Sequence, residues 1–400
     1  MLTSLSLIFL VGLSLAAICE RIRLPRIIGM IITGVLLGPY VLDWLDPQIL
    51  DLSSQLRQMA LIIILIKAGL SLNLSDLKKV GRPAVLMSFV PASFEILGYT
   101  LFAPLLLGVS RIEAALMGAV LGAVSPAVVV PRMLRLMDEK YGTEKSIPQL
   151  IMAGASCDDI FVIVLFTTFI GMAQGGKARL LDFLNIPISI LLGVAVGAVF
   201  GSVLALFFEK SYVHGHPIRN SVKVIIILGL SFLLMAIETW MKKIVAVSGL
   251  LAVVSMACLL KLKSAEFVTK RLSEKFGKLW LAAEVILFVL VGAAVDIRYT
   301  LDAGVTAVGM IFIALLFRSI GVALCLIKTS LNLKERLFCV IAYLPKATVQ
   351  AAIGSVPLSL GLPCGSAVLS VAVLGILITA PLGALGIDLS YKRLLKESME

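Results

Sequence analysis

The chain has 400 residues, of which 60% are hydrophobic and only 15% charged, and its mean hydropathy is +1.07. Because a soluble domain carries roughly a quarter charged residues, this composition excludes a soluble enzyme and indicates an all-α polytopic membrane protein. The net charge of +11 could indicate nucleic-acid binding, unless the basic residues gather on one side of a membrane.

Hydropathy and the spacing of Pro, Gly and charged residues predict about thirteen transmembrane helices of close to twenty residues each. An amphipathic linker on the inner membrane surface is predicted at 261–278, between the ninth and tenth spans. The predicted spans are 3–19, 27–42, 56–74, 83–108, 112–134, 148–174, 184–208, 221–240, 244–260, 279–297, 303–327, 335–357 and 364–387. Residues 1–400 are therefore expected to form a single membrane transport unit.

The basic residues predict the orientation of the chain. In the predicted loops, 25 Lys and Arg lie on the side reached after odd-numbered spans and 7 on the opposite side. The positive-inside rule then places the N-terminus outside and the C-terminus in the cytoplasm of a cell (inner) membrane. The positive charge thus reflects topology in a lipid bilayer, and no nucleic acid is expected as a partner. Three basic residues remain inside spans: Lys67, Arg318 and Lys346.

The two halves of the chain show a faint internal repeat. An offset of 223 places residues 65–81 over 288–304 and places Glu95 over Arg318, each a lone charge deep in its span. The matched spans are seven apart in the chain, so the two copies are inverted in the membrane. Since neither charge has another obvious partner, Glu95 and Arg318 are predicted to pair. The alternative is that each side chain extends separately to the membrane surface.

The predicted spans 112–134 and 335–357 carry prolines near their centres. Pro126 lies in LGAVSPAVVVPRM and Pro345 in AYLPKATVQAAIG. A proline in mid-helix removes a backbone donor and disrupts the preceding turn. A simple kink is one interpretation, but two breaks at matched positions favour crossed broken helices around an ion site at mid-membrane. Lys346 follows Pro345, where its charge suits the negative ends of the half-helices.

Two adjacent aspartates, Asp158 and Asp159, lie in the apolar stretch GASCDDIFVIVLF. A carboxylate at the bilayer centre costs about 2.5–3.5 kcal/mol, and adjacent helix positions point about 100° apart, so the two side chains are expected to have different roles. Burial and the neighbouring like charge favour the protonated form of at least one of them. A group that holds either a proton or a hard cation such as Na⁺ would perform exchange. The alternative is a pair of static salt bridges.

These motifs resemble the monovalent cation/proton antiporter superfamily, and within it the NHA-type sodium/proton antiporters, of which the chain resembles a bacterial relative. The stretches that carry the resemblance are LPRIIGMIITGVLLGP, AGASCDDI, SPAVVVP and, most specifically, LPKATVQAAIG. The resemblance implies an NhaA/NapA-like antiporter fold and a homodimer that works as an elevator. The moving part would be a core ion-transport domain, approximately 56–174 and 279–387. The dimerisation scaffold would be approximately 1–55 and 184–260.

The resemblance also implies roles for single residues. Asp159 matches the main ion- and proton-binding carboxylate, and Asp158 its neighbour, so both are candidate Na⁺ ligands. Ser125 and Pro126 match the unwound stretch near the ion, although several branches of the family have an acidic residue there. This departure leaves the backbone as the other candidate ligand. Further matches are Glu95 and Arg318 as a buried ion pair, and Lys346, after Pro345, as the charge at the helix crossing.

The sequence therefore predicts a secondary antiporter that exchanges Na⁺ (or Li⁺) for H⁺, with no enzyme activity and no cofactor. A permanent Glu95–Arg318 pair would keep the arginine protonated through the cycle, which favours electroneutral exchange. A K⁺/H⁺ antiporter of the same fold stays open as an alternative. So do a sodium-coupled organic-solute symporter and a channel or sensor that transports nothing by exchange.

Overall fold

The structure is a computed structural model that describes residues 1–22, 24–71, 80–175, 180–214, 218–241, 247–296 and 304–397. Within these ranges the chain is helical apart from its connections and one isolated antiparallel bridge between Tyr141 and Glu397. The predicted all-α class is confirmed.

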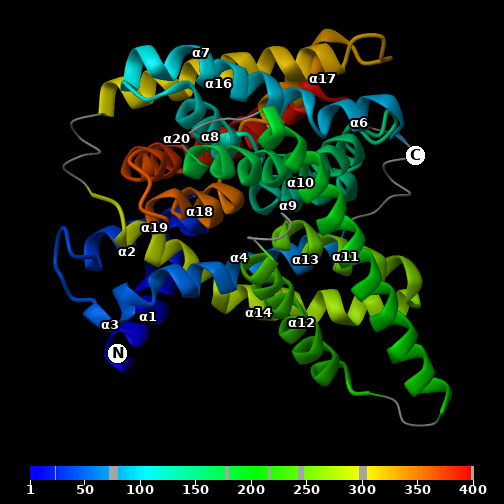
Figure 1. Ribbon diagram of the computed structural model, residues 1–400. Helices are drawn as coiled ribbons and strands as arrows, with labels where there is room; N and C mark the ends of the chain where they lie inside the picture. Colours follow the sequence, from blue (N-terminus) through cyan, green and yellow to red (C-terminus); the bar gives the residue numbers. More distant parts are fainter. Residues whose placement is uncertain are drawn as a thin grey trace. The chain divides into compact units, whose positions relative to one another are not determined.

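The helices keep the labels of Figure 1. In chain order they are α1 (Leu2–Arg21), α2 (Arg26–Leu37), α3 (Pro47–Asp51), α4 (Ser53–Ser71), α6 (Arg82–Met87), α7 (Val90–Leu107), α8 (Arg111–Leu121), α9 (Pro126–Asp138), α10 (Ile147–Gly175), α11 (Leu180–Val213), α12 (Asn220–Met241), α13 (Gly249–Lys263), α14 (Glu266–Ala293), α16 (Gly304–Cys325), α17 (Leu333–Ala342), α18 (Thr348–Gly354), α19 (Val356–Ser359) and α20 (Gly365–Leu394).

Nine segments of the described chain are long and apolar enough to cross a membrane. They are Leu2–Arg21, Arg82–Leu107, Arg111–Asp138, Ile147–Gln174, Leu191–Val213, Asn220–Met241, Glu266–Ala293, Gly304–Cys325 and Gly365–Leu394. The predicted spans 27–42, 56–74, 244–260 and 335–357 are not among them, so the count of about thirteen is not confirmed. Three of these four spans correspond to short helices. The span 27–42 corresponds to α2, with 12 residues, and 244–260 to α13, with 15. The span 335–357 is divided between α17, with 10 residues, and α18, with 7. Hydropathy marks a short apolar helix as readily as a long one.

The segment predicted as a separate amphipathic linker, 261–278, is part of longer helices. Residues 266–278 form the first half of α14, which continues without interruption to Ala293. Leu272 and Phe276 within it are fully buried and Trp280 is 4% exposed. These apolar side chains therefore pack against protein. The helix continues from the charged residues of 266–278 into the apolar residues up to Ala293.

The chain divides into two compact units. The larger unit comprises Met1–Arg57, Asn73–Ala173 and Val285–Glu400, and the smaller Gln58–Leu72 and Gln174–Glu284. In the larger unit α7 and α16 run side by side, α1 packs on α2, and α20 lies against α17, α18 and α19 (Figure 1). Residues 1–55 belong to the larger unit, and the predicted division into a core and a dimerisation scaffold stays a prediction.

In the smaller unit α11 packs lengthwise on α13, and α12 packs on α13 as well. Three glycines of α11, spaced four residues apart, face the backbone of α13 at Ser248, Ala252 and Met256. They are Gly193, Gly197 and Gly201. Small residues at this spacing let two helix backbones approach closely, as is typical of helix packing in membranes.

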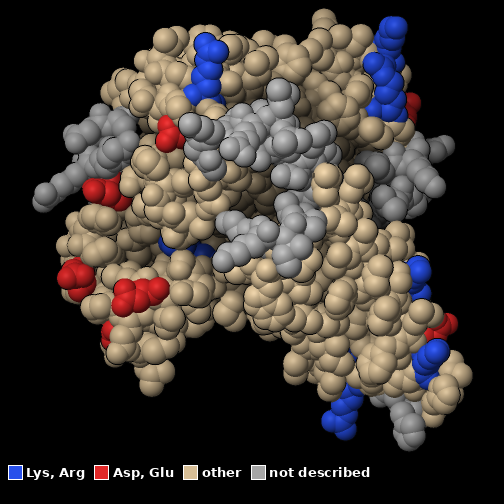
Figure 2. Space-filling view, viewed as in Figure 1, with Lys and Arg blue, Asp and Glu red and all other residues tan. Residues whose placement is uncertain are grey.

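Few charged side chains are visible on the face shown in Figure 2, whereas the interior contains several charged groups. Most of the atoms visible in Figure 2 belong to neither basic nor acidic side chains. The side chains of Glu95, Asp158, Arg318 and Lys346 are fully buried in the larger unit, and Asp159 is 6% exposed. Charged residues buried within apolar segments are typical of an ion pathway in a membrane protein.

Candidate functional site

Two interrupted helices form the centre of the larger unit. The helix that begins at Arg111 stops at Leu121 and resumes as α9 at Pro126, and the helix that begins at Leu333 stops at Ala342 and resumes as α18 at Thr348. We call residues 122–125 the first break and residues 343–347 the second break. The backbone N–H of Ser125 donates to the carbonyl of Pro345 at 2.8 Å, so the two breaks are hydrogen-bonded to each other.

The local chemistry accounts for both interruptions. Pro126 stands at the first position of α9, where its missing N–H costs nothing. Pro345 lies inside the second break, and its ring packs where a Cβ on Gly383 of α20 would be. The backbone N–H of Lys346 donates to the Thr379 hydroxyl of α20 at 3.0 Å. The second break is therefore held by α20 as well as by its own sequence.

An interrupted helix leaves backbone carbonyls without partners, and buried side chains satisfy them here. Arg318 of α16 donates from Nη1 to the carbonyl of Gly122 and from Nε to that of Tyr343 at 2.6 Å. Lys346 Nζ donates to the Leu121 carbonyl at 2.5 Å. The cations thus lie at the carbonyl ends of α8 and α17, where the helix dipoles favour positive charge.

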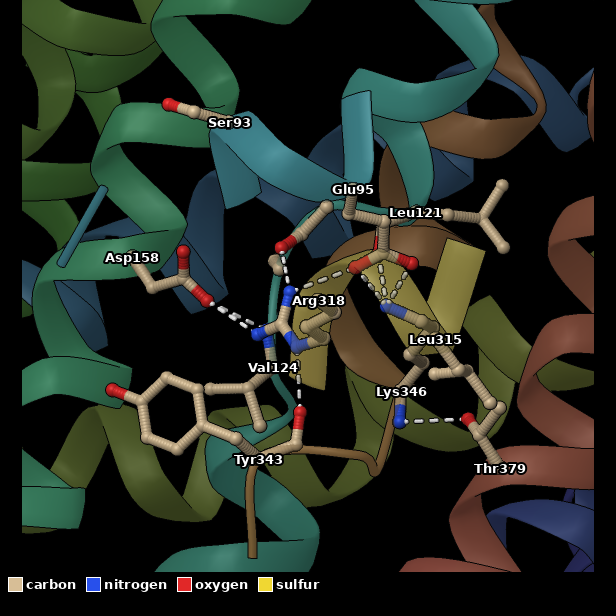
Figure 3. A network of polar contacts seen from close by, with 12 residues as sticks. Ser93, Glu95, Leu121, Val124, Asp158, Leu315, Arg318, Tyr343, Lys346 and Thr379 are labelled. Atoms are coloured by element: carbon tan, nitrogen blue, oxygen red, sulfur yellow. Dashed lines mark hydrogen bonds and ion pairs between the residues drawn. The ribbon is translucent and has the colours of Figure 1, made fainter. Parts of the chain in front are cut away.

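Buried ion pairs link the same cations to carboxylates (Figure 3). Arg318 Nη1 lies 2.8 Å from Glu95 Oε2, and its Nη2 lies 3.0 Å from Asp158 Oδ2. Lys346 Nζ lies 2.7 Å from Glu95 Oε1. Asp158 Oδ2 also accepts a hydrogen bond from the backbone N–H of Val124, in the first break, at 2.9 Å. Two cations therefore balance two carboxylates.

Asp158 forms an ion pair with Arg318, whereas Asp159 forms none with the described residues. The Oδ1 atoms of both aspartates and Ser125 Oγ are buried without a hydrogen-bond partner among those residues. Buried oxygen atoms without a partner are costly, and oxygen atoms are the ligands that hard cations prefer. The residues present thus fit a transported monovalent cation or a proton. The hydrogen bond from Val124 to Asp158 places the first break next to the aspartate pair.

The residues selected from the sequence come together in this network. Glu95 comes from α7, Asp158 and Asp159 from α10, and Arg318 from α16, while Ser125 and Lys346 belong to the first and second breaks. The predicted contact between Glu95 and Arg318 is present, and Asp158 has Arg318 as its basic partner. The roles of all these residues in transport stay predictions.

Sequence reasoning missed two groups of the site. Gln350 of α18 donates from Nε2 to the carbonyl of Ala123 at 2.7 Å, and the Tyr343 carbonyl binds Arg318. A glutamine at the third position of a helix is a known capping signal, so Gln350 could have been noticed. No pattern in the sequence indicates that the Tyr343 carbonyl binds Arg318.

Comparisons with known proteins identify the family of the chain. The family model described as "Sodium/hydrogen exchanger, transmembrane" matches residues 5–389. Human sodium/hydrogen exchanger 9B2 is 38% identical over 395 residues, which cover 94% of this chain and 70% of the relative. Human sodium/hydrogen exchanger 9B1 is 31% identical over 381 residues, covering 90% of this chain and 71% of the relative.

A solved structure extends the comparison to the fold. The sodium proton antiporter MjNhaP1 from Methanocaldococcus jannaschii superposes with a TM-score of 0.80 and 22% identity, over 98% of each chain. At this identity the likeness shows the antiporter fold alone. The family match and the human relatives carry the further conclusion: the chain belongs to the sodium/hydrogen exchanger family, and it is a multi-pass monovalent cation/proton antiporter rather than an enzyme.

Proposed function

We propose that the chain exchanges Na⁺ or Li⁺ for H⁺ at Asp159, with Asp158 and Ser125 supplying further oxygen ligands. One observation carries this proposal. Among the described residues of the buried network, Glu95 and Asp158 are each paired with a cation, whereas Asp159 has neither an ion pair nor a partner for Oδ1. A carboxylate in that position is neutralised by one Na⁺ or by one proton, and the two compete for it.

The same charge balance supports electroneutral exchange. Glu95 and Asp158 offset Arg318 and Lys346, so the site has the same net charge whether Asp159 holds Na⁺ or H⁺. Arg318 is bound by two carboxylates and two carbonyls, and Lys346 by Glu95 and the Leu121 carbonyl. Arg318 is therefore expected to keep its proton through the cycle, which favours the exchange of one cation for one proton.

The proposed cycle is an elevator in which the broken half-helices cross and carry the ion through the membrane. Its support is that every residue of the site belongs to one compact unit, as an ion-carrying part requires. The inverted repeat is supported by the pairing of Glu95 with Arg318, which the repeat places at equivalent positions. We further propose a homodimer in the inner membrane, with the N-terminus outside, as the basic residues indicate.

Sodium-driven proton flux in proteoliposomes tests the site. We expect Asp159→Asn to lose exchange almost completely, because an amide holds neither a proton nor the cation's charge. Asp51→Asn, which changes an exposed carboxylate, is the matched control and should exchange as the wild type does. Normal exchange by Asp159→Asn would refute the assignment of the site.

Cation and voltage series test the remaining parts of the proposal. Proton flux is measured with Na⁺, Li⁺ and K⁺ in turn; flux with K⁺ alone would identify the chain as a K⁺/H⁺ antiporter of the same fold. The rate should not depend on an imposed membrane potential, since no net charge moves. A strong dependence on the potential would exclude electroneutral exchange.

A further inference from the structure

Gln350 is a fully buried polar residue to which the proposed exchange assigns no part. Both ends of its amide are bound. Oε1 accepts a hydrogen bond from the backbone N–H of Ala347 at 2.8 Å, and Nε2 donates to the carbonyl of Ala123 at 2.7 Å. Nε2 also lies 3.4 Å from the carbonyl of Leu121. One side chain therefore connects the start of α18 to the end of α8.

The two bonds act on different parts of the site. The bond from Ala347 satisfies a backbone donor at the N-terminus of α18, directly after Lys346 in the chain. The bond to Ala123 orients the peptide that precedes Val124, whose N–H binds Asp158. Ser125, with its unpartnered hydroxyl, follows Val124. Rotation of the Ala123 peptide would therefore disturb two of the three oxygen atoms proposed to meet the cation.

The amide of Gln350 is also neutral. Consecutive carbonyls at the end of α8 bind Lys346, Arg318 and Gln350 in that order along the chain. A cation in place of Gln350 would add a third positive charge, whereas Glu95 and Asp158 already offset Arg318 and Lys346. An amide donates a hydrogen bond without changing the charge balance at Asp159.

We propose that Gln350 is a positioning residue for cation binding: its Nε2 donor holds the first break in the orientation that presents Ser125 and the Val124 N–H to the aspartates. This inference rests on the proposed exchange at Asp159. It assigns to Gln350 an effect on the KM for the cation, since its bonds act on the ligands, and a smaller effect on the maximal rate.

Two substitutions separate the donor from the rest of the side chain. Gln350→Glu keeps the shape and the oxygen that caps α18, but its ionised form has no hydrogen to donate. Gln350→Met keeps the approximate volume and loses both bonds. Gln48→Glu, at an exposed glutamine in α3, is the matched control. Each protein is reconstituted, and Na⁺-driven proton flux is measured against Na⁺ concentration at several pH values, beside wild type and Asp159→Asn.

Protonation of the introduced carboxyl group should restore the donor, since the acid donates through its O–H. Burial favours that protonated form, and Lys346, which shares the Leu121 carbonyl, opposes it. Glu95, Arg318, Asp158 and Asp159 are the other charged groups of the buried network. The charged side chains of α8 and α20, which pack on α18, lie more than two helical turns from Leu121 and Thr379.

We expect both Gln350 variants to raise the KM for Na⁺ about tenfold at alkaline pH, because a buried acceptor loses its donor. The KM of Gln350→Glu relative to wild type should fall as the pH falls, while that of Gln350→Met should not. Unchanged KM values, or parallel KM increases in both variants at every pH, would overturn the donor role. Failure of the proposed function is distinguishable, because Asp159→Asn would then exchange normally.

Discussion

The two breaks differ in what they contribute to the site. The first break, residues 122–125, contains no charged side chain, and its carbonyls and those next to it are bound by Arg318, Lys346 and Gln350 from other segments. The second break, residues 343–347, contains the cation Lys346 itself. Both breaks offer carbonyls, which Arg318 binds, but only the second break contributes a charged side chain. Arg318 therefore joins the two breaks, whereas Lys346 mainly neutralises the charge of Glu95.

The breaks also differ in packing. A Cβ at Gly122 in the first break would meet only ordinary or slightly tight contacts, at 3.1 Å or more. Around the second break, Gly383 lies directly against the Pro345 ring, and Gly154 of α10 lies directly against the Tyr343 hydroxyl. Shape complementarity therefore determines the second break more than the first.

Arg318→Met should have the largest effect, because it removes a charged side chain that binds carbonyls of both breaks and two carboxylates. Glu95 keeps Lys346, but Asp158 loses its cation and two carbonyls lose their donor. Removing one partner of a buried ion pair costs about 3–5 kcal/mol, and chemical unfolding in mixed micelles should show that loss. Arg132→Met is the control, because the partly exposed pair of Arg132 with Asp388 is worth at most about 1 kcal/mol. Equal stability of Arg318→Met and wild type would refute the joining role.

Lys346→Met should destabilise the fold less than Arg318→Met does. Glu95 keeps Arg318, and the Leu121 carbonyl keeps Gln350 as a distant donor. We expect a loss of about 2 kcal/mol in the free energy of unfolding, the range for one hydrogen bond to a charged group. The same unfolding experiment measures it. A loss as large as that of Arg318→Met would show that both cations join the breaks, and the distinction drawn here would fail.

Gly383→Ala tests the tighter packing of the second break. The new methyl group would overlap the Pro345 ring, and overpacking of this kind costs about 1–3 kcal/mol. Gly309→Ala in α16 is the matched control, since a Cβ there meets nothing within 4 Å and alanine favours a helix over glycine by about 1 kcal/mol. Unfolding free energies should therefore move in opposite directions. A stabilised Gly383→Ala variant would mean that the second break shifts to make room for the new methyl group on α20.

Ser125→Ala should have the smallest effect on stability and a selective effect on binding. The Ser125 hydroxyl is buried without a partner in the part of the chain that the structure describes, so its removal breaks no hydrogen bond seen there. We expect the KM for Na⁺ to rise about fivefold, as for the loss of one oxygen ligand worth about 1 kcal/mol. Ser93→Ala is the control, because that exposed hydroxyl donates to Phe89 of its own helix. An unchanged KM for Ser125→Ala would leave the backbone of the first break as the ligand.

Much of the network could be predicted because buried charge is expensive in a membrane. Five charged residues stand out in apolar segments of the sequence: Glu95, Asp158, Asp159, Arg318 and Lys346. Charged residues in such segments usually face the protein interior and pair with one another. The helix interruptions were predictable for a similar reason, since proline cannot donate a backbone hydrogen bond. Lone charges and prolines in apolar runs are local signals, visible in a single sequence.

The remaining features depended on contacts between distant segments. The count of spanning helices and the continuity of α14 follow from where helices end and what they bury, which hydropathy does not report. Only the resemblance to a family assigned different roles to Asp158 and Asp159, whereas in the structure Arg318 and the Val124 N–H bind Asp158. The sequence by itself therefore determined an apolar helical chain with a cluster of buried charges around two breaks. The tertiary structure decided which aspartate forms no ion pair with the described residues, because that depends on which of two adjacent side chains faces Arg318.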